Sequence, residues 1–417
     1  MWRGVLTLLL GAGAAQLGPL LLGPFLARLY GPEVFGLFHL ASAIGTNVAV
    51  VACARYEFAL PLARDEAEAR ALRELCVRVL VAVSVVTLGA ASAAVWWFEQ
   101  TWPLAVPALV ASLGALSLWT LEATRRERFA ALARARVVQF WGCGLLQLAL
   151  GVLQSGLWSL LWGPILAAAA ATAGLWRAAR GAAATPPSQP DHPVAAEADW
   201  RSTARTHRDF PLFNTPHALL GALQDTLSIA LIAAWAGPAA AGVWGLALRY
   251  LKAPATLAGG AVSQVLYPAL GAQRSPTEAA RAQVRRVMQV LMVIGAALGG
   301  AVFALANWAL PALLGPGWEA AGTVGQALAV YIAFHFVASP LGVVTLAWRA
   351  QGWALRAAVW GQFIFVAGLA LGLQGVGPAK GSLDAAAWVL SVGMALYFSW
   401  YFWRLWNWPL SPSAARQ

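Results

Sequence analysis

Charged residues are scarce in this chain of 417 residues, in which Asp, Glu, Lys and Arg together make up only 11%. Soluble globular domains carry about 25% of such residues. The chain therefore has too little polar surface to cover a water-soluble core of its size. Hydrophobic residues make up 60% of the chain, and the mean hydropathy is +0.66. This composition excludes a soluble protein and predicts an all-α membrane protein.

Cysteines and catalytic motifs are also scarce. The three cysteines, Cys53, Cys76 and Cys143, form no CxxC pair, so the sequence favours thiols packed in a core over a disulfide framework. The five histidines show no metal-ligand spacing, and the chain contains no HExxH, P-loop or GxSxG motif. We expect no catalytic residues, no metal and no cofactor, and a protein that is not an enzyme.

Apolar segments of roughly 20 residues, the length that crosses about 30 Å of hydrocarbon, recur along the chain. Their number predicts about twelve transmembrane helices. The approximate bounds are 5–27, 35–60, a helix ending at 96–97, 103–123, 137–153, 157–176, two helices within 209–268, 287–310, 320–347, 354–373 and 385–405. The proline-rich polar segment 181–208 is expected to be a flexible cytoplasmic linker between an N-terminal lobe, 1–180, and a C-terminal lobe, 209–417.

A short motif occurs twice, as GPEVFG at 31–36 and as GPAAAG at 237–242. The two copies lie about half a chain length apart, which indicates internal duplication. We expect two six-helix lobes related by a pseudo-two-fold axis along the membrane normal, with a central cavity between them. We interpret each motif as a tight turn, in which proline ends one helix and glycine permits the return of the chain.

The distribution of positive charge predicts the orientation in the membrane. If the N-terminus is cytoplasmic, 23 of the 28 Lys and Arg residues fall in cytoplasmic segments. Only Arg28 and Lys380 fall on the other side, and Arg55, Arg249 and Lys252 lie within spans. Such alternation follows the positive-inside rule, with both termini in the cytoplasm. It also explains the net charge of +11 without a nucleic-acid partner.

The hairpin 209–268 carries three ionisable residues, Asp225, Arg249 and Lys252, inside apolar runs. At about 1.5 Å of rise per residue, all three lie about 10–15 Å below the outer surface. Exposure of such groups to lipid costs about 2.5–3.5 kcal/mol each, so we expect them to face the lumen. Either Asp225 simply neutralises one cation, or the cations bind an anionic substrate.

Five segments resemble motifs of one protein family, the bacterial polysaccharide or O-antigen flippase-like family. This family belongs to the multidrug/oligosaccharidyl-lipid/polysaccharide (MOP) exporter superfamily. The segments are ARLYGPEVFGLF at 27–38, RYEFALP at 55–61, DFPLFNTP at 209–216, VSQVLYP at 262–268 and LGPGWEAAG at 314–322. They occur in order over most of the chain.

The resemblance implies a flippase of the bacterial inner membrane. Such a protein moves undecaprenyl-pyrophosphate-linked oligosaccharides, the repeat units of polysaccharide, O-antigen and lipopolysaccharide, from the cytoplasmic to the periplasmic leaflet by alternating access. It needs no cofactor, although H⁺ or Na⁺ is a candidate coupling ion. Its expected partners are the lipid-linked oligosaccharide, membrane lipids, a polysaccharide polymerase and glycosyltransferases.

Under this interpretation the cations of the lumen bind the substrate. Arg249 and Lys252 are expected to hold the pyrophosphate, since Arg and Lys suit phosphate oxygens, and Arg55 is a further candidate. Asp225 and Glu57 are candidate coupling groups or charge partners. A local ion pair between Arg55 and Glu57 is an alternative to a transport role, and Arg28 either gates the outer end of the first helix or reaches to the interface.

Two other functions remain open at this point. An ion-coupled multidrug exporter of the same superfamily should carry more acidic groups in its lumen than this chain does. A membrane polysaccharide polymerase or ligase should have a large outer loop, and the expected outer loops here are short. Gln147 and Gln154, seven residues apart, either line the lumen or bond neighbouring helices.

Overall fold

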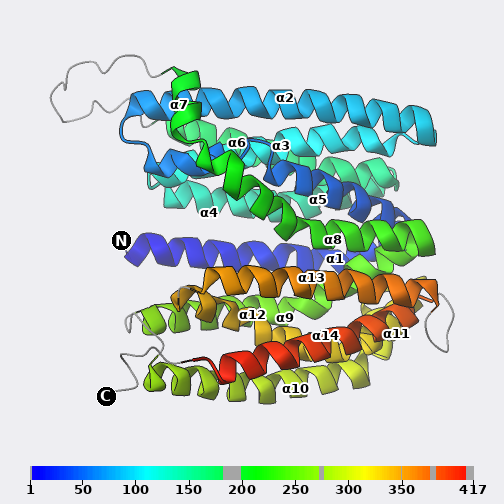
Figure 1. The fold of residues 1–417 in the computed structure, drawn as a ribbon. Helices are drawn as coiled ribbons and strands as arrows, with labels where there is room; N and C mark the ends of the chain where they lie inside the picture. Colours follow the sequence, from blue (N-terminus) through cyan, green and yellow to red (C-terminus); the bar gives the residue numbers. More distant parts are fainter. Residues whose placement is uncertain (1, 182–198, 272–276, 349, 376–381, 410–417) are drawn as a thin grey trace. The chain divides into compact units, whose positions relative to one another are not determined.

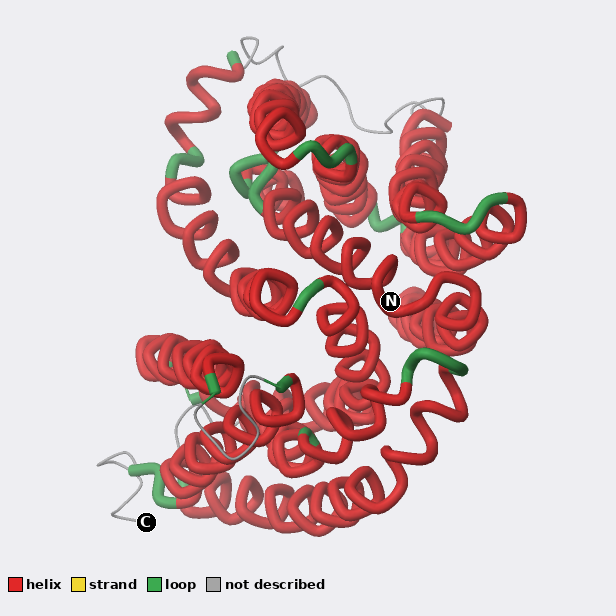
Figure 2. Tube along the Cα trace, turned by 90° about the vertical axis from the view of Figure 1, so that its right-hand side faces the viewer, coloured by secondary structure: helices red, strands yellow, loops and turns green. Residues whose placement is uncertain are grey.

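The computed structural model describes residues 2–181, 199–271, 277–348, 350–375 and 382–409, which are almost entirely helical (Figure 1). No strand occurs within these ranges (Figure 2). Eight of the described helices are long and apolar enough to cross a membrane, or nine if one bent pair counts as a single span. The predicted all-α membrane fold is confirmed, while the count of twelve spans is matched only in part.

Contacts divide the chain into two compact units, residues 1–226 and 227–417, with the boundary inside α8. In the first unit α1 packs against α3, α4 and α5, and α3 packs against α2 and α6. Its helices are α1 (Trp2–Val50), η1 (Tyr56–Leu62), α2 (Glu66–Phe98), η2 (Trp102–Leu104), α3 (Ala105–Arg125), α4 (Phe129–Val137), η3 (Val138–Gly142), α5 (Cys143–Leu153), α6 (Leu157–Gly181), α7 (Trp200–Thr206), η4 (Phe210–Asn214) and α8 (Thr215–Ala236).

In the second unit α12 packs against α9, α10 and α14, and α13 packs against α14. Its helices are α9 (Pro238–Gly271), α10 (Glu278–Leu314), α11 (Glu319–Ala327), α12 (Ala329–Ala347), α13 (Gln351–Gln374) and α14 (Leu383–Trp406). The predicted helix 320–347 is divided into α11 and α12, which meet at an angle of 60°.

The first glycine of each repeated Gly-Pro motif has a positive φ. Gly31 has a φ of 71° and Gly237 a φ of 87°, values at which an added side chain would be strained. A new helical segment follows each glycine, and α9 begins at Pro238. Our interpretation that proline ends a helix is wrong. Proline instead opens the next helix, where its missing N–H needs no partner, while the second glycines, Gly36 and Gly242, lie inside helices.

The first helix after this turn ends earlier than predicted. It was expected to reach residue 60, but α1 ends at Val50 and the 3₁₀ helix η1 follows. Two successive residues, Ala54 (φ 49°) and Arg55 (φ 62°), are left-handed, and a right-handed helix cannot continue through them. Arg55 and Glu57 therefore belong to a sharp turn and not to the end of a long helix.

The predicted linker 181–208 is only partly described by the structure. Residues 182–198 lie outside the described ranges, whereas α7 forms a short helix that packs on α2. Trp200 and Ala204 of α7 contact the buried cluster of α2 and α3. The C-terminal end of the linker is thus a structured helix.

Gln147 bonds neighbouring helices, as one of its two interpretations predicted. Its side-chain Nε2 donates to the carbonyl oxygen of Leu160 in α6 at 2.8 Å. The backbone carbonyl oxygen of Gln147 accepts a hydrogen bond from the hydroxyl of Tyr30 in α1 at 2.6 Å. Gln147 is buried, whereas Gln154 is exposed at the end of α5.

Helices α13 and α14 pack closely at Gly372, which gives a first prediction. A Cβ at this position would lie 2.2 Å from the Cα of Ala386, an atom that cannot move without shifting α14. Gly372→Ala should therefore destabilise the protein by about 1–3 kcal/mol. Gly300→Ala in α10, where a Cβ would meet no atom within 4 Å, should be neutral or stabilising by up to about 1 kcal/mol. Thermal unfolding in detergent checks both, and equal melting temperatures for the two variants would contradict this packing.

Candidate functional site

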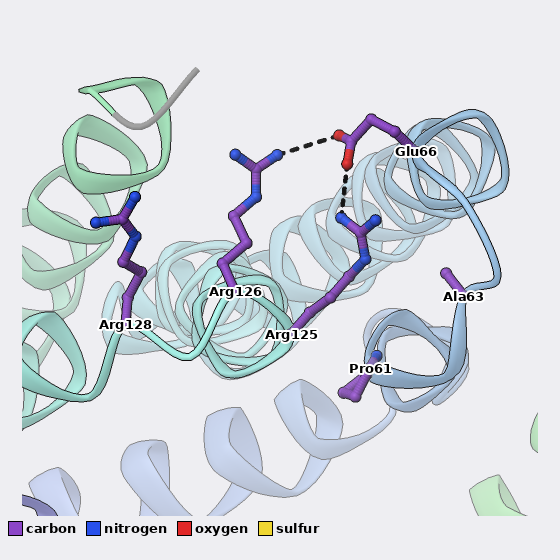
Figure 3. Close-up of a pocket in the computed structure, with 6 residues that line it drawn as sticks. All are labelled: Pro61, Ala63, Glu66, Arg125, Arg126 and Arg128. Atoms are coloured by element: carbon purple, nitrogen blue, oxygen red, sulfur yellow. Dashed lines mark hydrogen bonds and ion pairs between the residues drawn. The ribbon is translucent and has the colours of Figure 1, made fainter. Parts of the chain in front are cut away.

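A basic pocket lies where α2 begins and α3 ends. Its volume is about 510 Å³, and it is lined by Pro61, Ala63, Glu66, Arg125, Arg126 and Arg128 (Figure 3). The first two residues come from η1 and the loop after it, Glu66 from the first turn of α2, and the arginines from the end of α3 and the turn that follows. Asp65 caps α2 by accepting from the backbone N–H of Glu68 at 2.7 Å, which fixes the position of Glu66.

A fully buried carboxylate, Glu122 of α3, anchors the arginines beneath this pocket. Its Oε1 lies 2.6 Å from Nη1 of Arg73 and 2.7 Å from Nε of Arg126. Arg126 also donates to the carbonyl oxygen of Ala179 in α6 at 3.0 Å. One buried oxygen thus ties α2 and α3 together, and through Arg126 it also fixes the end of α6.

Glu66 closes the same network from the outer side, where its side chain is 51% exposed. Figure 3 shows the guanidinium groups of Arg125 and Arg126 directed at its carboxylate, with Arg128 standing apart. The distances are 2.8 Å to Nη1 of Arg125 and 3.1 Å to Nη2 of Arg126. The pocket and its anchor together contain four arginines and two glutamates, so a net charge of +2 faces the opening and favours an anionic ligand.

In the sequence these arginines predicted only the orientation of the chain, and Glu122 was not among the predicted site residues. The available signal was a glutamate inside an apolar helix, three and four residues before two arginines. The third partner, Arg73, is 49 residues away in the sequence and could not be assigned without the fold.

Lys252 points into the helical interior of the second unit. Its ammonium nitrogen lies 5.6 Å from the ring centre of Tyr331 in α12 and 5.9 Å from that of Phe365 in α13. Aromatic faces attract a cation at such distances. Lys252 also acts electrostatically on His335, which lies one helical turn along from Tyr331 with ring centres 5.5 Å apart and ring planes tilted by 52°.

A cavity of about 320 Å³ lies next to this aromatic cluster. Its wall carries the polar side chains of His335, Ser339, Thr345, Tyr397 and Tyr401 among small and apolar residues of α12, α13 and α14. Among the described residues, Nδ1 of His335 has no hydrogen-bond partner although it is buried. The second unit therefore has an aromatic cavity with Lys252 close to it.

The other hairpin residues are found in three different settings. Arg249 is half-buried on α9, three residues before Lys252, and Asp225 is exposed on α8. Asp225 falls in the first unit and the two cations in the second, and each is described in its own unit. Arg28 is exposed on α1, just before the break at Gly31.

Arg55 lies in the left-handed turn between α1 and η1, and Glu57 lies in the first turn of η1. The Arg55 guanidinium stacks over the ring of Phe58 at 4.0 Å and donates to the carbonyl oxygen of Val50 at 3.5 Å. The ion pairs found within the described ranges do not include one between Arg55 and Glu57, although the two charges interact. Glu57 is 1% exposed. Burial raises the pKa of its carboxyl above the usual value, and a backbone hydrogen bond and the nearby Arg55 oppose that shift.

Comparison with known proteins adds a family and a fold. A family model described as polysaccharide biosynthesis protein matches residues 25–322, more than half of the chain. No curated protein matches the sequence. A solved structure titled lipid II flippase MurJ, inward closed conformation, is similar with a TM-score of 0.67 and 11% identity, covering 96% of this chain and 87% of the other.

Two multidrug transporters are also similar. An inward-facing multidrug resistance MATE family transporter of the MOP superfamily matches with a TM-score of 0.59 and 13% identity, covering 96% of this chain and 94% of the other. A mutant of the Vibrio cholerae MATE transporter VcmN matches with a TM-score of 0.53 and 14% identity, covering 97% and 95%. At such identities the likeness is evidence of the fold alone, a helical fold of the MOP type.

Proposed function

Because the chain belongs to the polysaccharide biosynthesis protein family, whose model matches residues 25–322, we propose that it moves a lipid-linked oligosaccharide across the membrane. The family is the one that the five sequence motifs predicted. The chain is a multi-pass membrane protein with the fold of MOP flippases and exporters. The observation that carries the proposal is the family match together with similarity over 96% of the chain to a flippase whose name states a lipid substrate.

The substrate that fits best is an undecaprenyl-pyrophosphate-linked oligosaccharide, carried from the cytoplasmic to the periplasmic leaflet of a bacterial inner membrane. Arg249 and Lys252 are the proposed pyrophosphate ligands, with Arg55 as a further cation. The aromatic rings of Tyr331 and Phe365 lie close to Lys252, and they stabilise its positive charge by cation–π interactions while no anion is bound. Asp225 and Glu57 remain the proposed coupling or charge-partner groups, with H⁺ or Na⁺ as the coupling ion, and Arg28 the proposed gate.

The basic pocket of α2 and α3 suits the first encounter with this substrate. The arginine distribution predicts that the start of α2 and the end of α3 lie at the cytoplasmic surface. A net charge of +2 at that surface would raise the local concentration of anionic lipid headgroups. Arg128, which makes none of the ion pairs found in the described residues, has the position from which a guanidinium could contact a phosphate.

The orientation gives a second prediction. The proposal requires residues 181–208 and both termini to face the cytoplasm. A cysteine introduced as Pro190→Cys should therefore react with a membrane-impermeant maleimide in inverted vesicles and stay unlabelled in intact cells. Cys53 and Cys76 are buried and can stay in place, whereas Cys143→Ser removes the half-buried thiol from the background. Labelling of position 190 in intact cells would show that the protein has the opposite orientation in the membrane.

The transport proposal itself is tested by locating the lipid-linked repeat units. Cells that lack the protein should accumulate them on the cytoplasmic leaflet, and supplying the wild-type chain should restore their appearance on the periplasmic side. Accumulation of unpolymerised units on the periplasmic side would instead indicate a polymerase or ligase. The second candidate is a multidrug exporter, suggested by the similarity of the fold to two MATE transporters. Cells that accumulate no repeat units but become more sensitive to cationic drugs would favour it.

A further inference from the structure

Three potential metal ligands, none of which lines the basic pocket, meet in the first unit. The Sγ atoms of Cys53 and Cys76 and a carboxylate oxygen of Glu57 all lie within 4.8 Å of one another, and all three residues are buried. Around a tetrahedral zinc ion, bond lengths of about 2.0–2.3 Å separate neighbouring ligand atoms by about 3.3–3.8 Å. The three atoms therefore need only a small closing movement to share one ion.

The unusual turn after α1 creates this arrangement. Cys53 directly precedes the two left-handed residues, and Glu57 follows them in η1. The turn thus brings ligand atoms of both residues within 4.8 Å of Sγ of Cys76 in α2. Left-handed conformations of Ala and Arg cost about 1–3 kcal/mol each, and such strain tends to persist at functional sites.

Glu57 provides an independent sign that a ligand is missing. It is 1% exposed, and its Oε2 has no hydrogen-bond partner within the part of the chain that the structure describes. A buried carboxylate oxygen without a partner is costly. The nearby Ser117 favours the charged form of the carboxyl group, and Sγ of Cys53 lies 4.0 Å from the carbonyl oxygen of Gly114, but neither interaction supplies a partner for Oε2.

We propose that Cys53, Cys76 and Glu57 form a site for one Zn²⁺ ion, with a fourth tetrahedral position left for water. The two thiols each release a proton to solvent as a Zn–S bond forms, and no electron is transferred. Two thiolates, one carboxylate and Zn²⁺ leave one negative charge, which the neighbouring Arg55 balances. The bound ion would tie the turn after α1 to α2, whatever substrate the protein carries.

The donor set favours zinc over other cations. Thiolates exclude Mg²⁺ and Ca²⁺, which take oxygen ligands. Cu(I) prefers soft sulfur donors, whereas the carboxylate suits a borderline ion such as Zn²⁺. The expectation of packed thiols rested on sequence spacing, and spacing could not show that residues 53 and 76 meet.

The direct test uses the full-length protein in detergent with its thiols kept reduced. After loading with Zn²⁺ and removal of excess metal, elemental analysis should find one zinc per chain. Loading with Co²⁺ instead should produce a thiolate-to-cobalt charge-transfer band. The absence of that band in reduced wild-type protein would overturn the proposal without the need for any variant.

Variants then assign the ligands. Cys53→Ser and Cys76→Ser should each lose the cobalt band, and Glu57→Gln should weaken zinc binding by at least about tenfold, since even outer-shell changes cost about 10–100-fold. Cys143→Ser is the matched control and should bind like the wild type, because Cys143 lies on α5 outside the cluster. Zinc should raise the melting temperatures of the wild type and of Cys143→Ser, but not those of the three ligand variants.

Two results would contradict the site. Undiminished cobalt binding by Cys53→Ser and Cys76→Ser would place the metal elsewhere. Protein isolated without reductant that shows Cys53 and Cys76 joined in a disulfide, and that binds no zinc after reduction, would identify the pair as a redox couple.

Discussion

Glu122→Gln should destabilise the protein more than any other single change to a charged residue of the first unit. The substitution keeps the shape of the side chain but removes the charge that Arg73, Arg125 and Arg126 share. Glu122 is fully buried, and its Oε1 lies within 3.8 Å of all three guanidinium groups. Removing one partner of a buried pair costs about 3–5 kcal/mol. We expect the lower end of that range, because the arginines keep some access to solvent.

Glu66→Gln provides the matched control. Glu66 contacts the same three arginines, but it is 51% exposed. Exposed ion pairs contribute about 0–1 kcal/mol, so this variant should unfold close to the wild type. Denaturant or thermal unfolding in detergent measures both. If the two variants lost stability equally, Glu122 would not be the anchor of the network.

The double variant Arg249→Ala/Lys252→Ala should abolish export while the protein still inserts in the membrane. A hydrogen bond to a charged group contributes about 1.5–3 kcal/mol, so the loss of two such contacts with the pyrophosphate predicts a reduction of roughly 10²–10⁴-fold in transport. Expression and membrane insertion of the double variant are measured alongside export, so that loss of transport is separated from loss of the protein. Export is measured by complementation of a strain that lacks the protein.

The controls separate phosphate binding from general loss of charge. Arg356→Ala removes an exposed arginine of α13 whose Nε bonds to Gly352 of its own helix, and it should export normally. Lys252→Arg should retain most activity, since either cation can contact phosphate oxygens. Asp225→Asn should weaken export. Normal export by the double variant at normal expression would exclude Arg249 and Lys252 as substrate ligands.

The sequence predicted the membrane class and the main turns, because both depend on local properties. Apolar length marks the spans, and the glycines of the two Gly-Pro motifs mark positive φ. The same local logic failed at Ala54 and Arg55, since both residue types favour helices. Only the packing of Cys53, Tyr56 and Leu60 against α2 and α3 explains why the chain turns there.

The candidate sites could be predicted less well than the fold. The sequence predicted a depth for Lys252 in the membrane from its distance to Gly242. It could not show that this side chain lies against Tyr331 and Phe365, because α9 is apolar on most sides. Glu122 with Arg73 and Cys53 with Cys76 are pairs that meet across helices. Such contacts depend on the tertiary structure, and the spacing of residues in the sequence does not predict them.

The most direct test of the proposed function is a translocation measurement with purified protein in liposomes. An undecaprenyl-pyrophosphate-linked oligosaccharide is included in both leaflets, and an impermeant glycosidase is added outside. Wild-type protein should make the inner-leaflet substrate accessible to the enzyme, and the Arg249→Ala/Lys252→Ala variant should leave about half of it protected. The measurement is repeated with a gradient of H⁺ and with a gradient of Na⁺ across the membrane. If vesicles with wild-type protein then protected the same fraction of the substrate as protein-free vesicles, the protein would not be a flippase for this substrate.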